Sequence, residues 1–237
     1  MADILGEAIL DYYRRKRGYK LWVHDEHGPN LEMPVKIYFR TEKEMPALEL
    51  KALQLCKGSV LDIGAGAGSH TLALQAKGMD VTAIDISPKA VEVMKARGVR
   101  KAIAQDIFSF AGQKFDTLLL MMNGIGLCGC TEGLKRFLKH AEILLKPGGQ
   151  LLFDSSDVAY LYEDEPFPMN RYYGEIICRY EYKKKTSGWL TWLYIDRDFL
   201  EEIARKSGWD TEIIFEDNKD QYLARLTLTP AAGGGEP

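Results

Sequence analysis

Three glycines that alternate with alanines follow an acidic residue near position 60. Residues 60–70 read Val-Leu-Asp-Ile-Gly-Ala-Gly-Ala-Gly-Ser-His, which places the acid at Asp62 and the glycines at Gly64, Gly66 and Gly68. Alternating glycines let a backbone turn sharply and come close to a ligand, and the start of a following helix presents unpaired N–H groups. A tight turn without a ligand explains one glycine but not three. The segment therefore predicts a strand, a loop that binds a nucleotide-like ligand, and a helix.

Acidic residues also follow the next two apolar runs. Asp85 ends the run Val-Thr-Ala-Ile 21 residues after Gly64, a spacing at which a carboxylate accepts hydrogen bonds from a ribose. Ile86 beside it is placed to pack on an adenine face. Asp106, followed by Ile107, is placed to accept a hydrogen bond from an adenine amino group. The alternative for each acid is an ordinary turn residue at the end of a strand.

The spacing of the glycines distinguishes between nucleotide ligands. A dinucleotide fingerprint, Gly-x-Gly-x-x-Gly, needs its third glycine at position 69, where this chain has Ser69. A phosphate-binding P-loop needs a Gly-Lys-Ser/Thr sequence, which does not follow the loop. An NAD-dependent oxidoreductase is therefore a weaker alternative, and a P-loop enzyme is weaker still.

Short apolar runs and amphipathic segments alternate from residue 46 onward, and these elements must position the loop and the acids. Apolar runs predict strands that are buried on both faces, and their alternation with helices predicts a parallel sheet covered on both sides, an α/β fold. After residue 157 the pattern changes to a hairpin, a helix and an antiparallel pair. The expected strands are 59–63, 80–84, 102–105, 115–122, 150–153, 175–184, 189–195, 211–216 and 221–229, and the expected helices are 46–56, 70–77, 88–97, 134–145 and 197–206.

The first 45 residues do not follow this alternation. We expect a helix over 3–17 and a strand-like stretch over 35–39, and the remainder mixes aromatic, acidic and proline residues. The end of the chain contains three consecutive glycines, which cannot bury enough surface to become ordered. The expected division is an N-terminal helix and lid segment at 1–45, one domain at 46–230 with a hairpin insertion at about 172–196, and a disordered tail at 231–237.

Together these features resemble the class I S-adenosylmethionine-dependent methyltransferases. The matching residues are the glycine loop, the acids Asp85 and Asp106, and two further motifs, Phe115-Asp116 at the start of the fourth strand and Leu-Lys-Pro-Gly-Gly at 145–149 before the fifth. The resemblance covers roughly residues 46–229. It implies a Rossmann-like, seven-stranded methyltransferase sheet that is mostly parallel, with an antiparallel last strand and helices on both faces.

The resemblance also implies that S-adenosylmethionine is the cofactor. Its methionine end would lie over the glycine loop, its ribose on Asp85, and its adenine between Ile86 and the turn at Asp106. Tyr38 and Arg40 in the lid segment are further candidates, for the methionine carboxylate. The candidate cofactor residues are Asp62, Gly64, Ala65, Gly66, Gly68, Asp85, Ile86, Asp106, Ile107 and Asn123, with Tyr38 and Arg40 added.

Polar residues after the fourth and fifth strands are candidates for the methyl acceptor site. Ligands of open α/β sheets lie outside the carboxyl ends of the strands, which nominates Asn123, Asp154 and Asp157 as acceptor-facing residues. The implied mechanism is an in-line displacement at the methyl carbon, which needs a general base only when the acceptor must lose a proton. No catalytic residue is assigned. The aromatic residues of the hairpin either line the acceptor site or only pack against their own sheet.

The composition of the chain limits the classes of partner that it is expected to bind. Lys and Arg total 31 against 34 Asp and Glu, a net charge of −3, which offers no long-range attraction to nucleic acid or an anionic membrane. No segment approaches the ~20 apolar residues that span a bilayer, and four scattered cysteines indicate a reducing compartment, so we expect a cytoplasmic protein. The pair His24 and His27 and the pair Cys128 and Cys130 are each too few for a metal site, so no metal is expected.

The sequence therefore predicts a methyltransferase that uses S-adenosylmethionine on a small-molecule acceptor. The alternative from a different class is a non-catalytic, regulatory module that binds S-adenosylmethionine. The sequence does not indicate an oligomeric state.

Overall fold

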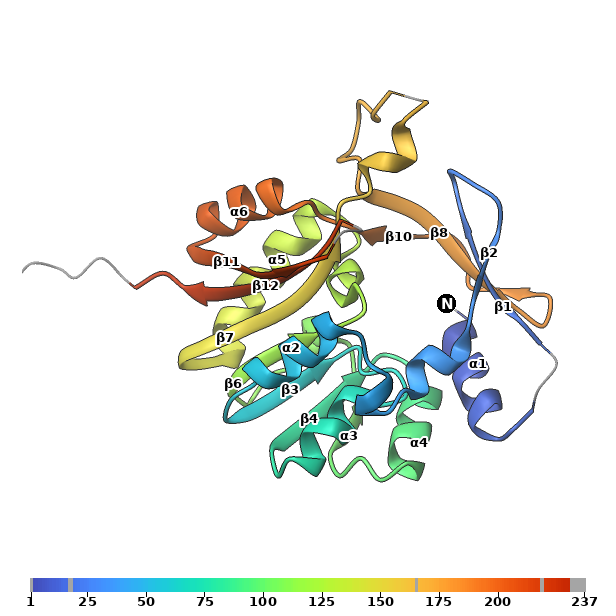
Figure 1. Ribbon diagram of the computed structural model, residues 1–237, viewed down its shortest axis with the longest axis horizontal. Coiled ribbons are helices and arrows are strands. Elements are labelled where there is room, and N and C mark those ends of the chain that lie inside the picture. The colour runs from blue at the N-terminus through green and yellow to red at the C-terminus, as the bar shows by residue number, and fades with distance from the viewer. Residues whose placement is uncertain (1, 17–18, 165, 218–219, 231–237) are drawn as a thin grey trace, which may run out of the picture.

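A seven-stranded sheet runs through the molecule in the computed structural model, which describes residues 2–16, 19–164, 166–217 and 220–230 (Figure 1). The expected tail at 231–237 lies outside the described residues. The strand order is β11-β12-β7-β6-β3-β4-β5. The strands from β7 to β5 are parallel, whereas β12 is antiparallel to both of its neighbours. The strands are β3 (Ser59–Ile63), β4 (Asp80–Asp85), β5 (Ala102–Ala104), β6 (Phe115–Leu120), β7 (Leu145–Ser156), β11 (Trp209–Glu216) and β12 (Gln221–Leu228).

Helices cover both faces of this sheet, so the expected α/β class and seven-stranded architecture are confirmed (Figure 1). One face packs against the second, third and fourth helices, and the other face packs against the fifth and sixth. These helices are α2 (Ala47–Leu55), α3 (Ser69–Ala76), α4 (Pro88–Ala96), α5 (Thr131–Leu144) and α6 (Arg197–Lys206).

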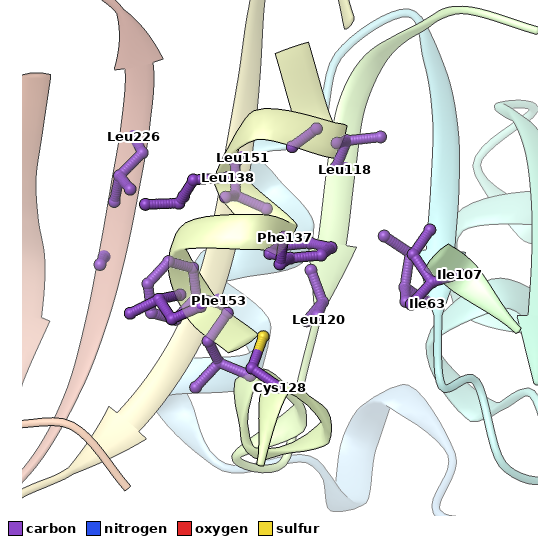
Figure 2. Close-up of a cluster of buried hydrophobic side chains, with 14 of the residues drawn as sticks. Ile63, Ile107, Leu118, Leu120, Cys128, Phe137, Leu138, Leu151, Phe153 and Leu226 are labelled. Atoms are coloured by element: carbon purple, nitrogen blue, oxygen red, sulfur yellow. The ribbon is translucent and has the colours of Figure 1, made fainter. Parts of the chain in front are cut away.

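Successive side chains of the central strands enter two different cores. Leu118 and Leu151 pack against Phe137 of α5 and its neighbours (Figure 2), whereas Leu119 and Leu152 pack on the opposite face against α2 and α3. Side chains of a strand alternate between the two faces of its sheet. Because both faces are covered, the central strands carry consecutive apolar residues, such as Leu118–Leu120 and Leu151–Phe153.

Asp116 joins the amino ends of the parallel strands. Its carboxylate accepts hydrogen bonds from the Ser59 N–H and from Lys146 Nζ, each at 2.7 Å. The hydrogen bond from Lys146, with those from Ser59, holds the pKa of Asp116 well below its usual range. The motifs at 115–116 and 145–149 therefore meet at the end of the sheet opposite the glycine loop, where they serve the fold.

A second, antiparallel sheet combines the N-terminal segment with the inserted hairpin (Figure 1). The hairpin pairing of β8 with β10 is present as expected, but β8 also pairs with β1 on its other side, which the sequence pattern does not indicate. Helix α1 contacts both β8 and α4, so it connects the two sheets. The elements are α1 (Ile4–Tyr13), β1 (Leu21–Asp25), β2 (Leu31–Met33), β8 (Glu175–Tyr182), β9 (Lys185–Thr186) and β10 (Leu190–Leu193).

Two expectations for the N-terminal segment are wrong. The first helix ends at Tyr13 rather than at residue 17, because the chain turns at Arg15, which has a φ of 57°. The stretch Val35–Phe39 is the 3-10 helix η1 and not a strand. Val35, Tyr38 and Phe39 recur at helical spacing, and this spacing lets all three pack against α1 and the glycine loop.

Phe137→Ala should lower the free energy of unfolding by about 3–5 kcal/mol, because it removes a fully buried ring and leaves a cavity. Urea denaturation measures this change. Ile143→Ala on the same helix is the matched control, since Ile143 is 56% exposed, and should change the free energy of unfolding by only about 0.5 kcal/mol. Equal losses in the two variants would contradict this description of the core.

Candidate functional site

The glycine loop begins where β3 ends. The N–H groups of Gly64 and Ala65 donate to the carbonyl of Ile84 at 2.9 and 3.1 Å, which joins the loop to β4. Gly64 has a φ of 69°, and a Cβ there would meet no atom within 4 Å, so this part of the loop presents bare backbone. At Gly68 a Cβ would lie 2.8 Å from Val99 Cγ2, so that glycine allows close packing.

Asp85 lies at the end of β4 with its carboxylate turned toward the loop. One oxygen accepts a hydrogen bond from the Gly66 N–H and the other from the Ser87 N–H, both at 2.8 Å. Burial raises the pKa of Asp85 to about 6, although these two hydrogen bonds favour the charged form. Each carboxylate oxygen has two lone pairs, so both can still accept hydrogen bonds from a ligand.

The adjacent strand ends place the other candidates for the adenine. Ile86 follows Asp85 and is 75% exposed, so it offers an apolar surface. Asp106 follows the neighbouring strand β5, is exposed, and accepts a hydrogen bond from the Phe108 N–H at 3.0 Å. Ile107 is buried in the core, so its side chain supports the turn from below.

Asp62 near the end of β3 and Ala65 within the loop have side chains that face the helices behind the loop. Asp62 is buried and accepts a hydrogen bond from Thr71 Oγ1 in α3 at 2.5 Å. Burial raises the pKa of Asp62, and the nearby His70 and Thr71 only partly offset that effect. Ala65 packs in the cluster that includes α4. Both residues therefore hold the loop against the helices behind it.

Tyr38 of η1 lies directly against the glycine loop. A Cβ at Gly66 would be 3.1 Å from Tyr38 Cδ1. The Tyr38 hydroxyl donates to the sulfur of Met33 at 3.2 Å, and its carbonyl accepts from Ser69 Oγ at 2.7 Å. The lid segment is thus attached to the first residue of α3.

Arg40 is engaged by a buried partner that the sequence does not reveal. Its guanidinium forms an ion pair with Glu49 of α2, and the other Glu49 oxygen lies 2.9 Å from His70 Nε2. Burial opposes a positive charge on His70, but the hydrogen bond to Glu49 and the negative charges of Glu49, Asp62 and Asp154 together outweigh burial and raise the pKa of His70. The chain Arg40–Glu49–His70 links the lid segment to the start of α3.

Asn123 follows β6 in a strained conformation. Met122 and Asn123 have φ values of 63° and 54°, in the left-handed region that non-glycine residues rarely adopt. The Asn123 N–H donates to Asp154 Oδ2 at 2.9 Å, and its carbonyl accepts from Trp192 Nε1 at 3.1 Å. Asn123 Oδ1 accepts from Ser156 Oγ at 3.2 Å. Such strain persists only where the surroundings enforce it, and it is concentrated at functional sites.

Asp154 lies beside Asn123, as expected, and is fully buried. Its Oδ2 also accepts a hydrogen bond from Gln221 Nε2 at 2.8 Å, whereas Oδ1 has no partner within the described part of the chain. Burial raises the pKa of Asp154 to about 6. Gln221 comes from β12, and its position in the sequence gives no sign of this contact.

Asp157 faces a different environment. Its carboxylate accepts hydrogen bonds from the Tyr173 hydroxyl at 2.8 Å and from the Ala159 N–H at 2.9 Å. It lines a hollow of about 250 Å³ whose walls carry six carboxyl side chains and Arg197. Gln221 lines the same hollow and also contacts Asp154, so it lies between the two acids.

Some aromatic residues of the hairpin pack within the fold, and Trp192 contacts the loop that carries Asn123. Tyr172 donates to Asp196 at 2.5 Å, and Tyr182 is buried against α1, so these two residues pack. Trp192 instead contacts the loop that carries Asn123. Packing and contact with the candidate site are therefore divided among individual side chains.

Within the described ranges, no group of three or more His, Cys, Asp or Glu side chains is arranged to hold a metal ion. None of the described helices is both long and apolar enough to cross a membrane.

Comparison with known proteins connects this geometry to a reaction. Residues 61–153 match the family model of a methyltransferase domain. The ubiquinone biosynthesis O-methyltransferase of Xylella fastidiosa is 30% identical over 138 residues, 54% of this chain and 51% of its own length. The demethylmenaquinone methyltransferase of Tropheryma whipplei is 31% identical over 98 residues, 39% of each chain. The chain thus spans about half of the length of the first of these curated relatives and 39% of the second.

A solved structure matches over nearly the whole chain. It is an S-adenosylmethionine-dependent methyltransferase from Bacteroides fragilis in complex with S-adenosyl-L-homocysteine, 45% identical, with a TM-score of 0.90 over 96% of this chain and 95% of that one. The CcbJ methyltransferase of Streptomyces caelestis is 14% identical with a TM-score of 0.65, over 95% of this chain and 98% of that one, a likeness of fold alone.

Gly126→Ala should lower the free energy of unfolding by about 1–3 kcal/mol, because the added Cβ would overlap the Trp192 indole. Urea denaturation of a double-mutant cycle tests this cause. In a Trp192→Leu background the same substitution should change stability by only about 0.5 kcal/mol, since the obstructing ring is gone. Full additivity of the two substitutions would contradict the contact.

Proposed function

Because this chain belongs to the S-adenosylmethionine-dependent methyltransferases, we propose that it transfers the cofactor's methyl group in line to a small-molecule acceptor. Membership of the family and the identity of the cofactor confirm the resemblance expected from the glycine loop, and they exclude the NAD-dependent alternative. We further propose that residues 46–230 form the methyltransferase domain, and that 1–45 and the insertion at about 172–196 cover its site.

The bare glycine loop supports a cofactor site at the carboxyl ends of β3 and β4. Gly64 leaves its backbone open, and α3 begins directly behind the loop, an arrangement that suits the methionine carboxylate. Asp85 keeps free lone pairs for the ribose hydroxyls, and the exposed Ile86 offers an apolar surface for the adenine. The exposed carboxyl of Asp106 would accept from the adenine amino group.

The two lid candidates take different parts in this proposal. Tyr38 packs on Gly66, which supports a direct contact with the methionine end of the cofactor. Arg40 is bound by Glu49, so its influence reaches the loop through His70. Asp62, Ala65, Gly68 and Ile107 are proposed to shape the site from beneath.

S-adenosylmethionine supplies a methyl group on a positively charged sulfur that departs as a neutral thioether. The chain has therefore to hold the acceptor atom in line and to exclude water. Asn123 is held rigidly at the end of β6, adjacent to β3, which supports a place beside the transferred methyl. Asp154 Oδ1 is buried without a described partner, and the raised pKa of Asp154, about 6, suits it to accept a hydrogen bond or a proton from the acceptor. Asp157 is proposed as a secondary contact.

A small molecule is the acceptor class best supported. The net charge of −3 gives no attraction for nucleic acid. The curated relatives are named for steps that make ubiquinone and menaquinone, which are small molecules. The observation that carries the whole proposal is the 45% identity, over nearly the full chain, to a methyltransferase with S-adenosyl-L-homocysteine bound.

The affinity for S-adenosyl-L-homocysteine should fall about tenfold between pH 8 and pH 5, because the raised pKa of Asp85, about 6, leaves only a minor fraction ionised at pH 5. Isothermal titration calorimetry measures the affinity. Asp85→Asn should bind more weakly by about 1–3 kcal/mol at pH 8 and should lose the pH dependence. Asp80→Asn, at the far end of the same strand, is the control and should follow the wild-type curve. A wild-type profile retained by Asp85→Asn would remove Asp85 from the ribose site.

The enzyme should methylate at least one member of a panel that presents four different nucleophiles, namely hydroquinone, benzylamine, benzoate and thiophenol. Incubation with methyl-labelled S-adenosylmethionine and mass spectrometry of the products measures transfer. Asn123→Ala should lower kcat for the methylated compound at least about tenfold, a barrier increase of about 1.4 kcal/mol. Label appearing only on added protein would contradict a small-molecule acceptor.

A further inference from the structure

The loop that follows β6 is held at both of its ends by the second sheet. We define this acceptor loop as residues 123–131, from Asn123 to the first residue of α5. We propose that Trp192 and Glu175 are positioning residues that set its conformation, so that the second sheet is a working part of the methyl-transfer site. The inference rests on the proposed function in placing Asn123 beside the transferred methyl.

Trp192 of β10 holds the start of the acceptor loop. Its indole Nε1 donates to the Asn123 carbonyl at 3.1 Å, and the same carbonyl accepts from the Gly126 N–H at 3.0 Å. The indole also occupies the space in which a side chain at position 126 would lie. Next to Trp192, the Thr191 carbonyl would be 3.4 Å from a Cβ at Gly129. Strand β10 therefore follows the loop along most of its length.

Glu175 of β8 holds the end of the acceptor loop. Its Oε1 accepts a hydrogen bond from the Thr131 N–H at 2.9 Å. The first N–H groups of a helix have no partner within the helix, and a side chain just before it normally supplies one. The residue in that position is Cys130, whose side chain makes no such bond. Glu175 thus caps α5 from a different sheet, with a negative charge that suits the helix N-terminus.

The two contacts come from neighbouring positions of one sheet. Leu193 pairs with Glu175 and Trp192 pairs with Ile176 across the β8–β10 ladder. The ladder fixes the distance between the indole and the carboxylate, so any displacement of the second sheet moves both ends of the acceptor loop together.

The acceptor loop needs this external support. Met122 and Asn123 both have left-handed backbone conformations although neither is a glycine. Asp154 and Ser156 of β7 bind the N–H and the side chain of Asn123 but not its carbonyl. Without the bond from Trp192, nothing described in the second sheet would hold the Asn123 carbonyl against relaxation of this strain. The main sheet therefore holds the N–H and the side chain of Asn123, and the second sheet holds its carbonyl.

Hydrogen–deuterium exchange on the full chain with S-adenosyl-L-homocysteine bound tests the coupling without an acceptor. Trp192→Phe should raise the exchange rates of the amides at 124–129 at least tenfold, whereas Trp189→Phe, a 52% exposed neighbour, should leave them unchanged. Glu175→Ala should raise exchange at the start of α5, and Glu175→Gln, which keeps an acceptor oxygen, should restore most of the protection. Glu181→Ala is the matched control on the same strand, because the side chain of Glu181 contacts His24, with Oε2 2.9 Å from Nε2, and not the acceptor loop.

Exchange in Trp192→Phe that matches Trp189→Phe would overturn the proposal, as would exchange in Glu175→Ala that matches Glu181→Ala. Should Trp192→Phe fail to fold, as judged by circular dichroism, the Glu175 series still decides the question.

Kinetics separate positioning from a general loss of structure. With the panel compound that the wild-type enzyme methylates, Trp192→Phe should lower kcat at least tenfold while the KM for S-adenosylmethionine changes less than twofold. A rise of that KM in step with the fall in kcat would overturn the positioning role. If no panel compound is methylated, the proposed function fails, but the exchange measurements still confirm or overturn the coupling of the two sheets.

Discussion

The position of the glycine loop depends on the hydrogen bonds that the carboxylate of Asp85 accepts. This carboxylate accepts hydrogen bonds from the N–H of Gly66 in the loop after β3 and from the N–H of Ser87 at the start of α4. Two strand-to-helix connections are thereby joined by a single side chain, although burial of this carboxylate is unfavourable, as its raised pKa indicates. A buried carboxylate whose hydrogen bonds are satisfied makes the groups around it rigid.

The main sheet could be predicted because its signals are local. The strand Ser59–Ile63 agrees with expectation because a run of apolar residues indicates burial on both faces. The helix Arg197–Lys206 agrees because its apolar residues recur at helical spacing. The second sheet could not be predicted in full. The pairing of Trp22 with Glu181 joins segments that are far apart in the sequence, and neither segment carries a sign of its partner. The stretch Val35–Phe39 is a 3-10 helix and not the expected strand, because β-branched and aromatic residues also suit a short helix that packs on one side.

The same division applies to the site. The glycine loop and Asp85 are recognisable because one spacing rule connects them along the chain, and the structure brings them together. Asn123 and Asp154 follow from their places at strand ends. Glu49, Gln221 and Glu175 could not be found, because each reaches the candidate site from an element whose neighbours are set only by the tertiary fold. Trp192 is one of the hairpin aromatics that the sequence nominates, but its contact with Asn123 could not be predicted. The sequence nominates Arg40 for the cofactor but carries no sign of its partner Glu49.

The pairing of β1 with β8 also implies an order of folding. Closing so long a loop is entropically unfavourable in an extended chain, and the closure becomes easy only after the intervening main sheet has brought Trp22 and Glu181 near each other. We therefore expect the second sheet, and α1 with it, to assemble after the main sheet. A folding intermediate would carry a nearly complete main sheet while the acceptor loop still lacked its outer support. Acquisition of activity would then lag behind acquisition of secondary structure during refolding.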